Sequence, residues 1–152
     1  MMRKNSKNAF TLIEALVSVA ITAIGFAGVI ALVSTSNEVM NKSIDKEKLK
    51  FQNTEIMEVL NGDQANIMEY NGKDLSQCSS LTVNTGKEDQ LARLKNWCNK
   101  LEGEVGAKRT TDKRTIQVEK KLVQGNYVYI VSLELSGKDD KSVFMKRVIY
   151  AQ

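Results

Sequence analysis

The feature that most constrains this chain is an apolar stretch close to its N-terminus. Between Phe10 and Val33 the sequence holds a single charged residue, Glu14. As an α-helix these 24 residues would be about 36 Å long, at about 1.5 Å per residue, which is enough to cross the hydrocarbon core of a bilayer. We therefore expect three parts: a basic segment (1–9), a transmembrane helix (10–33) and a soluble globular domain (34–152).

The positive charge of the chain is concentrated ahead of this stretch. The formal net charge is +4, and three of the cationic residues, Arg3, Lys4 and Lys7, lie in the first nine positions. The remainder carries a net charge of only +1, so the overall charge gives little support to nucleic-acid binding. A short basic segment before an apolar helix is expected to stay in the cytoplasm. An ordinary secretory signal is the alternative, but its cleavage site would follow the apolar stretch, near Ala27–Ala31.

The residue types that most enzyme and metal sites require are scarce. The sequence contains no histidine, which removes the usual general base and the commonest metal ligand. Its two cysteines, Cys78 and Cys98, do not have the spacing of a metal-ligand pair. We expect no catalytic residues, no metal site and no cofactor.

The helical pattern continues well beyond the apolar stretch. Neither proline nor glycine interrupts residues 30–61, and Gly62 is a suitable helix end. The pattern predicts one helix from Phe10 to Leu60 whose first half is apolar all round and whose second half is amphipathic. The predicted apolar stripe of the second half consists of Met40, Ile44, Phe51, Ile56 and Leu60.

Two further helices are predicted after Gly62. A short one is expected around residues 65–70, and an amphipathic one over residues 87–102. Thr85 and Glu88 fit a capping box for the latter, and Gly103 follows its expected end. Its predicted apolar stripe consists of Leu91, Leu94, Cys98 and Leu101. Trp97 lies beside this stripe and is expected to be a partly buried core residue, with an exposed contact residue as the alternative.

The C-terminal third alternates with the period of β-strands. Strands are predicted over residues 115–123, 127–135 and 142–151, with a tight turn at Gly125-Asn126 and a looser one at 137–140. A three-stranded antiparallel sheet needs a cover, and the amphipathic half of the long helix can supply it. The expected fold class is α+β.

The hexapeptide Ala9-Phe10-Thr11-Leu12-Ile13-Glu14 resembles the N-terminal signature of type IV prepilins and related pseudopilins. In that family a short basic leader precedes Phe-Thr-Leu-Ile-Glu, which opens a long apolar helix. The arrangement of the whole chain is similar to that family as well, which implies the pilin-like version of an α+β fold. The chain departs from the family at Ala9, where glycine is usual.

The resemblance implies how the N-terminus is processed. A prepilin peptidase would cleave between Ala9 and Phe10 and methylate the new amino group of Phe10. Glu14 would then form a salt bridge with the amino terminus of a neighbouring subunit. The alternative is a carboxylate that reaches the lipid headgroups, since an acid inside hydrocarbon normally needs a partner.

The resemblance also implies a location and a set of partners. The chain would cross the cell (inner) membrane once, with its N-terminus in the cytoplasm and its globular domain outside, and would later reach the pilus at the cell surface. The implied partners are other pilins through the N-terminal helix, the prepilin peptidase, the inner-membrane assembly platform and the lipid bilayer. In an oxidising compartment Cys78 and Cys98 would form a disulfide, with two buried free thiols as the alternative.

The segment 90–106 and the strands after it most resemble PilV-like minor pilins. A minor pilin that incorporates into a type IV pilus, or primes its assembly, is therefore the first expectation. A GspI-like pseudopilin of type II secretion and a major pilin are the alternatives within the family, and the absence of proline argues against a major pilin. Outside the family, the chain would be a single-pass anchor that holds a binding domain without forming a filament.

A basic cluster lies before and within the first predicted strand. A solvated edge is the ordinary interpretation of such a cluster. Contact with DNA by its first four members, in a competence-type pilin, is the alternative, although no aromatic residues are interleaved there to stack on bases. The cluster comprises Lys108, Arg109, Lys113, Arg114, Lys120 and Lys121.

Overall fold

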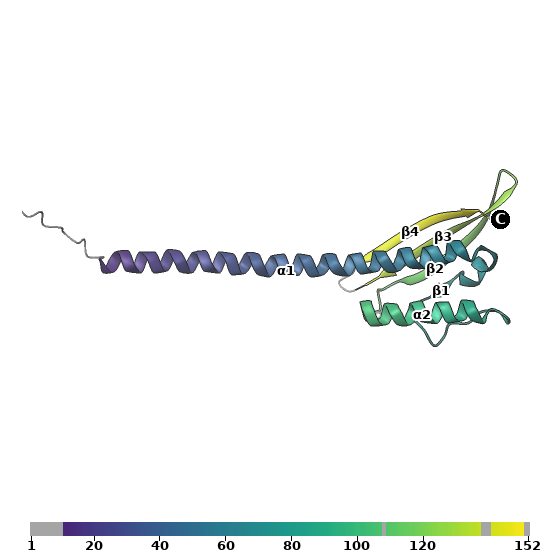
Figure 1. Ribbon diagram of the computed structural model, residues 1–152, viewed down its shortest axis with the longest axis horizontal. Helices are drawn as coiled ribbons and strands as arrows, with labels where there is room; N and C mark the ends of the chain where they lie inside the picture. Colours follow the sequence, from purple (N-terminus) through teal and green to yellow (C-terminus); the bar gives the residue numbers. More distant parts are fainter. Residues whose placement is uncertain (1–10, 108, 138–140, 151–152) are drawn as a thin grey trace, which may run out of the picture. The chain divides into compact units, whose positions relative to one another are not determined.

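The computed structural model describes residues 11–107, 109–137 and 141–150. The chain divides into two compact units, residues 1–41 and 42–152, and the long helix α1 (Leu12–Gly62) contributes residues to both. The second unit also contains a 3-10 helix, η1 (Gln64–Tyr70), and an α-helix, α2 (Glu88–Val105). Its strands are β1 (Lys73–Asp74), β2 (Arg114–Val123), β3 (Asn126–Ser136) and β4 (Ser142–Tyr150) (Figure 1).

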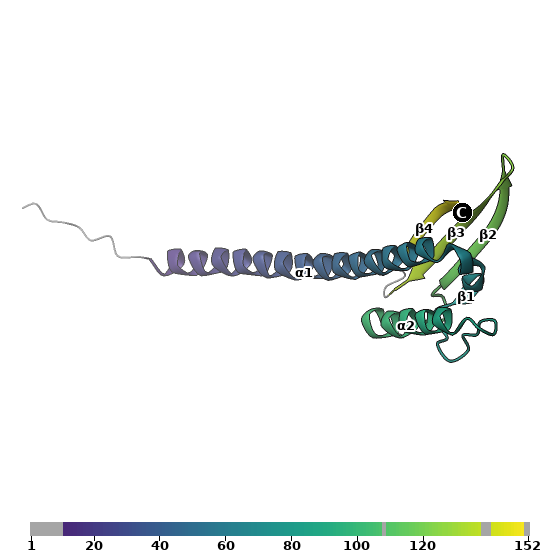
Figure 2. The same ribbon diagram turned by 45° about the vertical axis from the view of Figure 1, so that its right-hand side comes forward.

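The sheet is antiparallel throughout and has the order β1-β2-β3-β4 (Figure 2). The α+β, pilin-like fold class is therefore confirmed, but the sheet has four strands rather than three. The additional strand β1 is two residues long and pairs Lys73 with Ile116 and Asp74 with Thr115. Two residues are too few to produce a recognisable alternation, so the sequence could not indicate this strand.

The turn between β2 and β3 lies one residue earlier than predicted. Val123 pairs with Asn126, so the two turn residues are Gln124 and Gly125 rather than Gly125 and Asn126. Both have positive φ, 51° and 83°, as a type I′ hairpin turn requires. The prediction favoured Asn126 because asparagine is common in such turns, but Asn126 is the first residue of β3. The looser turn predicted at 137–140 lies mostly outside the described residues.

The second half of α1 covers the sheet along a narrower stripe than predicted. Ile56 and Leu60 are fully buried, whereas Met40, Ile44 and Phe51 are exposed, so these three positions were predicted wrongly. Phe51 is five residues before Ile56, which places it about 140° away around the helix. The buried positions of α1 are Leu49, Gln52, Asn53, Ile56, Met57 and Leu60.

A buried amide fixes α1 against two strands. The Asn53 side chain is fully buried, and its Nδ2 donates to the Val143 carbonyl at 3.3 Å and to the Leu133 carbonyl at 3.5 Å. Glu58, five residues further along α1, accepts from Arg147 of β4 at 2.6 Å. These contacts position the helix over β3 and β4.

Helix α2 extends three residues beyond its predicted end. Gly103 lies inside the helix, and Gly106, with a φ of 93°, is the residue that caps it. The predicted capping box is also wrong: Lys87 occupies the N-cap without a side-chain cap bond, and Glu88 accepts instead from the Gly86 backbone. The core positions are confirmed, since Leu94, Trp97, Cys98 and Leu101 are all buried and Leu91 is half-buried.

A carboxylate at the end of α1 joins three elements. Asp63 Oδ2 accepts from Tyr70 Oη at 2.8 Å, from Gln90 Nε2 at 2.9 Å and from Arg93 Nη1 at 2.7 Å. Burial acts to raise the pKa of Asp63, but the hydrogen bonds from Gln90, Asn66 and Tyr70 and the charge of Arg93 outweigh it and lower the pKa. Burial and the bond to Asp63 raise the pKa of Tyr70 to about 12, so its hydroxyl remains a donor.

We predict that Asp63→Asn lowers the free energy of unfolding at neutral pH by about 1–3 kcal/mol, because an amide accepts these bonds less strongly than a carboxylate. A lowered folded-state pKa stabilises the folded state above the unfolded-state pKa, and this contribution is lost as the pH falls through the folded-state value. Denaturant titrations of the full chain in detergent micelles should therefore show wild type losing more stability than the variant on acidification. Parallel acid profiles would contradict this role of Asp63.

We predict that Gly137→Ala destabilises the second unit by about 1–3 kcal/mol, because its added methyl group would overpack the core. The new Cβ would lie 2.7 Å from Leu49 Cδ1 and 3.0 Å from Val105 Cγ1, and both side chains are buried. Gly103→Ala is the matched control, since a Cβ there meets nothing within 4 Å. In the middle of α2 this control should raise the free energy of unfolding by about 0.8–1 kcal/mol, whereas a helix that ended before Gly103 would give no such gain.

Candidate assembly site at the start of the long helix

The first turns of α1 present an exposed apolar surface. Every residue from Thr11 to Val33 is exposed, including Leu12 at 81% and Ile24 at 74%. A contiguous apolar surface of this extent is expected to contact lipid or other protein helices. By length and composition, α1 contains a stretch that can cross a membrane once.

Glu14, the one acid of this stretch, is hydrogen-bonded to the nearby Thr11. Glu14 Oε2 accepts from the Thr11 backbone N–H at 2.9 Å and from Thr11 Oγ1 at 2.8 Å, while the Glu14 N–H lies 3.4 Å from Thr11 Oγ1. Since α1 begins at Leu12, these contacts form a capping box with Thr11 as the N-cap. The sequence carries the signal for this box, Thr-x-x-Glu before an apolar run, but the motif was predicted only at Thr85 and Glu88.

The hydroxyl groups further along the apolar stretch are satisfied within the helix. Ser18 Oγ donates to the Glu14 carbonyl and Thr22 Oγ1 to the Ser18 carbonyl, each at 2.7 Å. Such bonds to the preceding turn allow a hydroxyl to sit in hydrocarbon without a partner from outside. Among the described residues of the stretch, Glu14 is therefore the one charged group left for an external partner.

The predicted cleavage and methylation positions, Ala9 and Phe10, lie outside the described residues. Their roles remain predictions.

Comparison with protein families identifies this region. Residues 4–30 match the prokaryotic N-terminal methylation motif. The chain carries a type IV pilin signature. The match covers Glu14 and the first turns of α1, and the comparisons with curated proteins and with solved structures found no match.

The signature supports a type IV pilin or a pseudopilin, and it points to a structural protein rather than an enzyme. It also indicates assembly with other pilins and processing by a prepilin peptidase. Because it ends at residue 30, before the soluble part of the chain, it gives no support to the more specific resemblance to PilV-like minor pilins.

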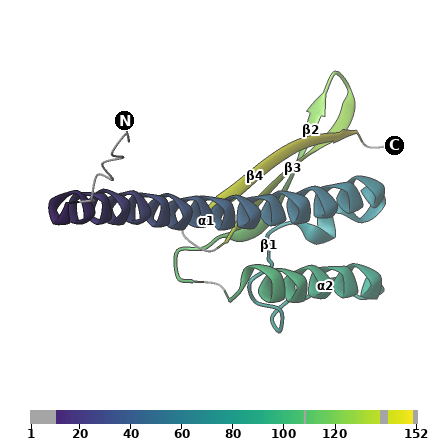
Figure 3. The ribbon, with the colours of Figure 1, turned by 60° about the vertical axis from the view of Figure 1, so that its left-hand side comes forward.

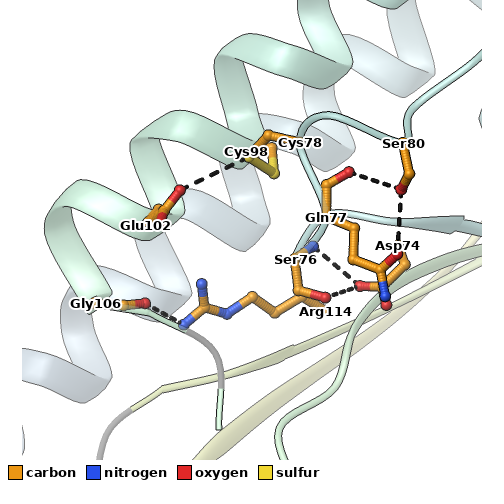
Figure 4. Close-up of a disulfide and its surroundings, with 9 residues drawn as sticks. All are labelled: Asp74, Ser76, Gln77, Cys78, Ser80, Cys98, Glu102, Gly106 and Arg114. Carbon is orange, nitrogen blue, oxygen red and sulfur yellow. Dashed lines mark hydrogen bonds between the residues drawn. A yellow bond between two sulfur atoms is a disulfide. The ribbon is translucent and has the colours of Figure 1, made fainter.

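Cys78 and Cys98 form a disulfide, with Cα atoms 5.5 Å apart (Figure 4). The bond attaches the loop after β1 to the buried face of α2, and Glu102 Oε2 lies 4.0 Å from Cys78 Sγ. Hydrogen bonds within the loop hold it near the bond: Asp74 Oδ1 accepts from the backbone and hydroxyl of Ser76. The predicted disulfide is therefore confirmed, and the alternative of two free thiols is wrong.

The basic cluster does not form one open cationic surface. Arg114 is 1% exposed, and its guanidinium donates to the Gly106 carbonyl at 2.7 Å (Figure 4). It also donates to the Ser136 carbonyl at 3.1 Å. Burial lowers its pKa, while the charges of Asp112, Glu102 and Asp74 oppose this effect. Arg114 is therefore a structural residue that joins the end of α2 to the sheet, and it cannot reach a phosphate on a surface-bound nucleic acid.

Two other members of the cluster, Arg109 and Lys113, make separate contacts. Arg109 Nη2 lies 3.3 Å from Asp112 Oδ1 and donates to the Gly137 carbonyl at 2.9 Å. Burial acts to raise the pKa of Asp112, but the backbone and side-chain bonds from Arg109 outweigh it and lower the pKa. Lys113 Nζ lies 3.9 Å from Glu134 Oε2. Lys108 lies outside the described residues, and a DNA contact by this cluster remains an untested prediction.

We predict that removing the disulfide with Cys78→Ala and Cys98→Ala together lowers the free energy of unfolding by about 3 kcal/mol, since the bond closes a loop of 20 residues. Thermal unfolding of the full chain in micelles would measure the loss. A reductant should lower the melting temperature of wild type and leave that of the double variant unchanged. Equal sensitivity of both proteins to the reductant would contradict the assignment, as would native and reduced masses that do not differ by two hydrogens.

Proposed function

We propose that the chain is a minor subunit of a type IV pilus, which incorporates into the filament or primes its assembly. Residues 1–9 would be its leader, residues 10–33 its membrane span and later its filament core, and residues 34–152 its globular domain. In the membrane the N-terminus would face the cytoplasm and the globular domain the outside. The observation that carries the proposal is the exposed apolar stretch of α1 that ends at Val33, whose one acid, Glu14, lies inside a type IV pilin signature.

The proposed assembly step depends on a charge that processing creates. Cleavage between Ala9 and Phe10 would release a new amino group, which the peptidase would methylate without removing its positive charge. Docking the Phe10 amine of one subunit against Glu14 of a neighbour would neutralise the carboxylate inside an apolar environment, where an unpaired charge is costly. An uncleaved chain offers no such amine, so incorporation would follow processing.

The capping box supports a specific docking geometry. The backbone N–H and the hydroxyl of Thr11 both donate to Oε2 of Glu14, while Oε1 has no hydrogen-bond partner among the described residues. A carboxylate has acceptor capacity on both oxygens. The neighbouring amine would therefore bind at Oε1, and Thr11 would orient the carboxylate without having to release it.

We predict that Glu14→Val leaves cleavage at Ala9 and Phe10 intact and reduces incorporation into filaments by about tenfold or more, because the neighbour's amine would be buried without a counter-charge. Ser18→Ala is the matched control, since it removes a hydroxyl from the same helix that bonds only to its own backbone. The measurements are the N-terminal sequence of the mature protein and the amount of subunit in sheared filaments.

The two halves of this test separate the outcomes. Normal incorporation of the Glu14→Val variant into filaments would contradict the proposed salt bridge. A mature protein that retains residues 1–9 in cells with an active prepilin peptidase would instead favour the single-pass anchor without a filament.

A GspI-like pseudopilin of type II secretion is the second candidate, because the same signature supports both groups. Genes beside this one would distinguish them: pilus assembly components favour the first candidate, and secretion components favour the second.

A further inference from the structure

Strand β4 is an open edge of the sheet. It pairs with β3 on one side, and within the described residues no strand or loop pairs with its other side (Figures 1 and 3). At nine residues it is longer than the short edge strands that proteins commonly use to discourage strand addition.

The register shows which residues face the open side. The Gly137 N–H donates to the Lys141 carbonyl at 2.8 Å, and the pairing continues as Ser136 with Ser142 and Leu135 with Val143. Hydrogen-bonded and non-hydrogen-bonded pairs alternate in an antiparallel ladder. The odd-numbered residues 143–149 therefore bond to β3, and the even-numbered residues 142–150 direct their N–H and C=O groups outward.

The same even-numbered residues carry the exposed side chains of the strand. Phe144 is 62% exposed, Val148 is 50% exposed and Tyr150 is 70% exposed. Among the odd-numbered residues, Ile149 is buried and Val143 and Met145 pack against the core, so these side chains stabilise the fold. The free backbone groups and an exposed apolar surface thus belong to one set of residues.

Lys146 lies in the middle of this set, directly opposite an uncharged residue of β3. It is exposed, its cross-strand neighbour on β3 is the uncharged Ser132, and among the described residues no acid forms an ion pair with it. Arg147, the next residue, is already paired with Glu58 at 2.6 Å. An incoming strand would therefore gain from an acidic residue beside Lys146.

A second copy of β4 is a poor occupant of this edge. The antiparallel register that pairs the most residues of two β4 strands is centred on Lys146. It would place the two Lys146 side chains directly opposite each other, and like charges in that position are destabilising.

We propose that β4 is a docking edge for an extended segment of a different protein, which adds to the sheet as a fifth strand. The segment has apolar residues beside Phe144 and Val148 and an acidic residue beside Lys146. Main-chain hydrogen bonds to the even-numbered residues supply affinity, and the alternating side chains supply selectivity. Because of the charge of Lys146, a strand with an acidic residue at this position binds more tightly than an uncharged apolar strand.

The test uses two peptides with the full-length chain in detergent micelles. The probe is a nine-residue peptide of threonines with valine at positions 3 and 7 and glutamate at position 5, and the control carries lysine at position 5. Fluorescence anisotropy of the labelled peptides should show the glutamate peptide binding about 3- to 10-fold more tightly than the control. Lys146→Glu should reverse this preference.

Two variants of one residue separate strand addition from side-chain contact. Val148→Pro removes an N–H that faces the open side and no bond to β3, so the fold should persist, as far-UV circular dichroism would verify, while peptide binding is lost. Val148→Ala keeps the N–H and should retain binding with a loss of less than about tenfold.

Four results would overturn the proposal: no binding of the glutamate peptide at millimolar concentration, equal binding of both peptides, peptide binding by a folded Val148→Pro variant, or self-association through β4. Binding of an oligothymidylate that Lys146→Glu abolishes, with no peptide binding, would show a nucleic-acid surface instead. None of these measurements requires a filament, so failure here is distinct from failure of the proposed function.

Discussion

The chain must remove the surface of Leu12–Val33 from water, and its other N-terminal features follow from that requirement. An apolar helix can enter lipid only if its polar groups are satisfied, and Ser18 and Thr22 meet this condition by bonding to the preceding turn. Glu14 cannot be satisfied in this way, because its charge remains when Thr11 caps it. The apolar stretch Leu12–Val33 therefore carries one charged group, close to its start, that a neighbouring molecule can neutralise.

In the second unit, two helices are held in fixed positions on a small sheet. Apolar burial supplies most of the stabilisation, but it is not directional and would tolerate sliding. Buried polar groups fix the positions: Asn53 attaches α1 to β3 and β4, and Arg114 attaches the end of α2 to the sheet. Asp63 then joins the end of α1 to η1 and α2.

The sequence predicted what depends on long periodic patterns. The extent of α1, the presence of α2, the three long strands and the burial of Trp97 could all be obtained from periodicity and glycine placement. It failed where tertiary contacts decide. Gly103 was predicted to follow the end of a helix because glycine is common there, but it lies inside α2, which Gly106 caps. Arg114 belongs to a basic cluster in the sequence, but its side chain is buried in the fold. The Asp63 network joins residues up to 30 positions apart, which no local pattern can show.

The alternation along β4 has an evolutionary consequence. Substitutions at three of its odd-numbered positions are constrained by the core, since Ile149 is buried and Val143 and Met145 pack against the core. Substitutions at its even-numbered positions change surface chemistry with little effect on folding, because those side chains are exposed. Related chains could thus diverge rapidly at every second residue of one strand while their scaffold stays the same.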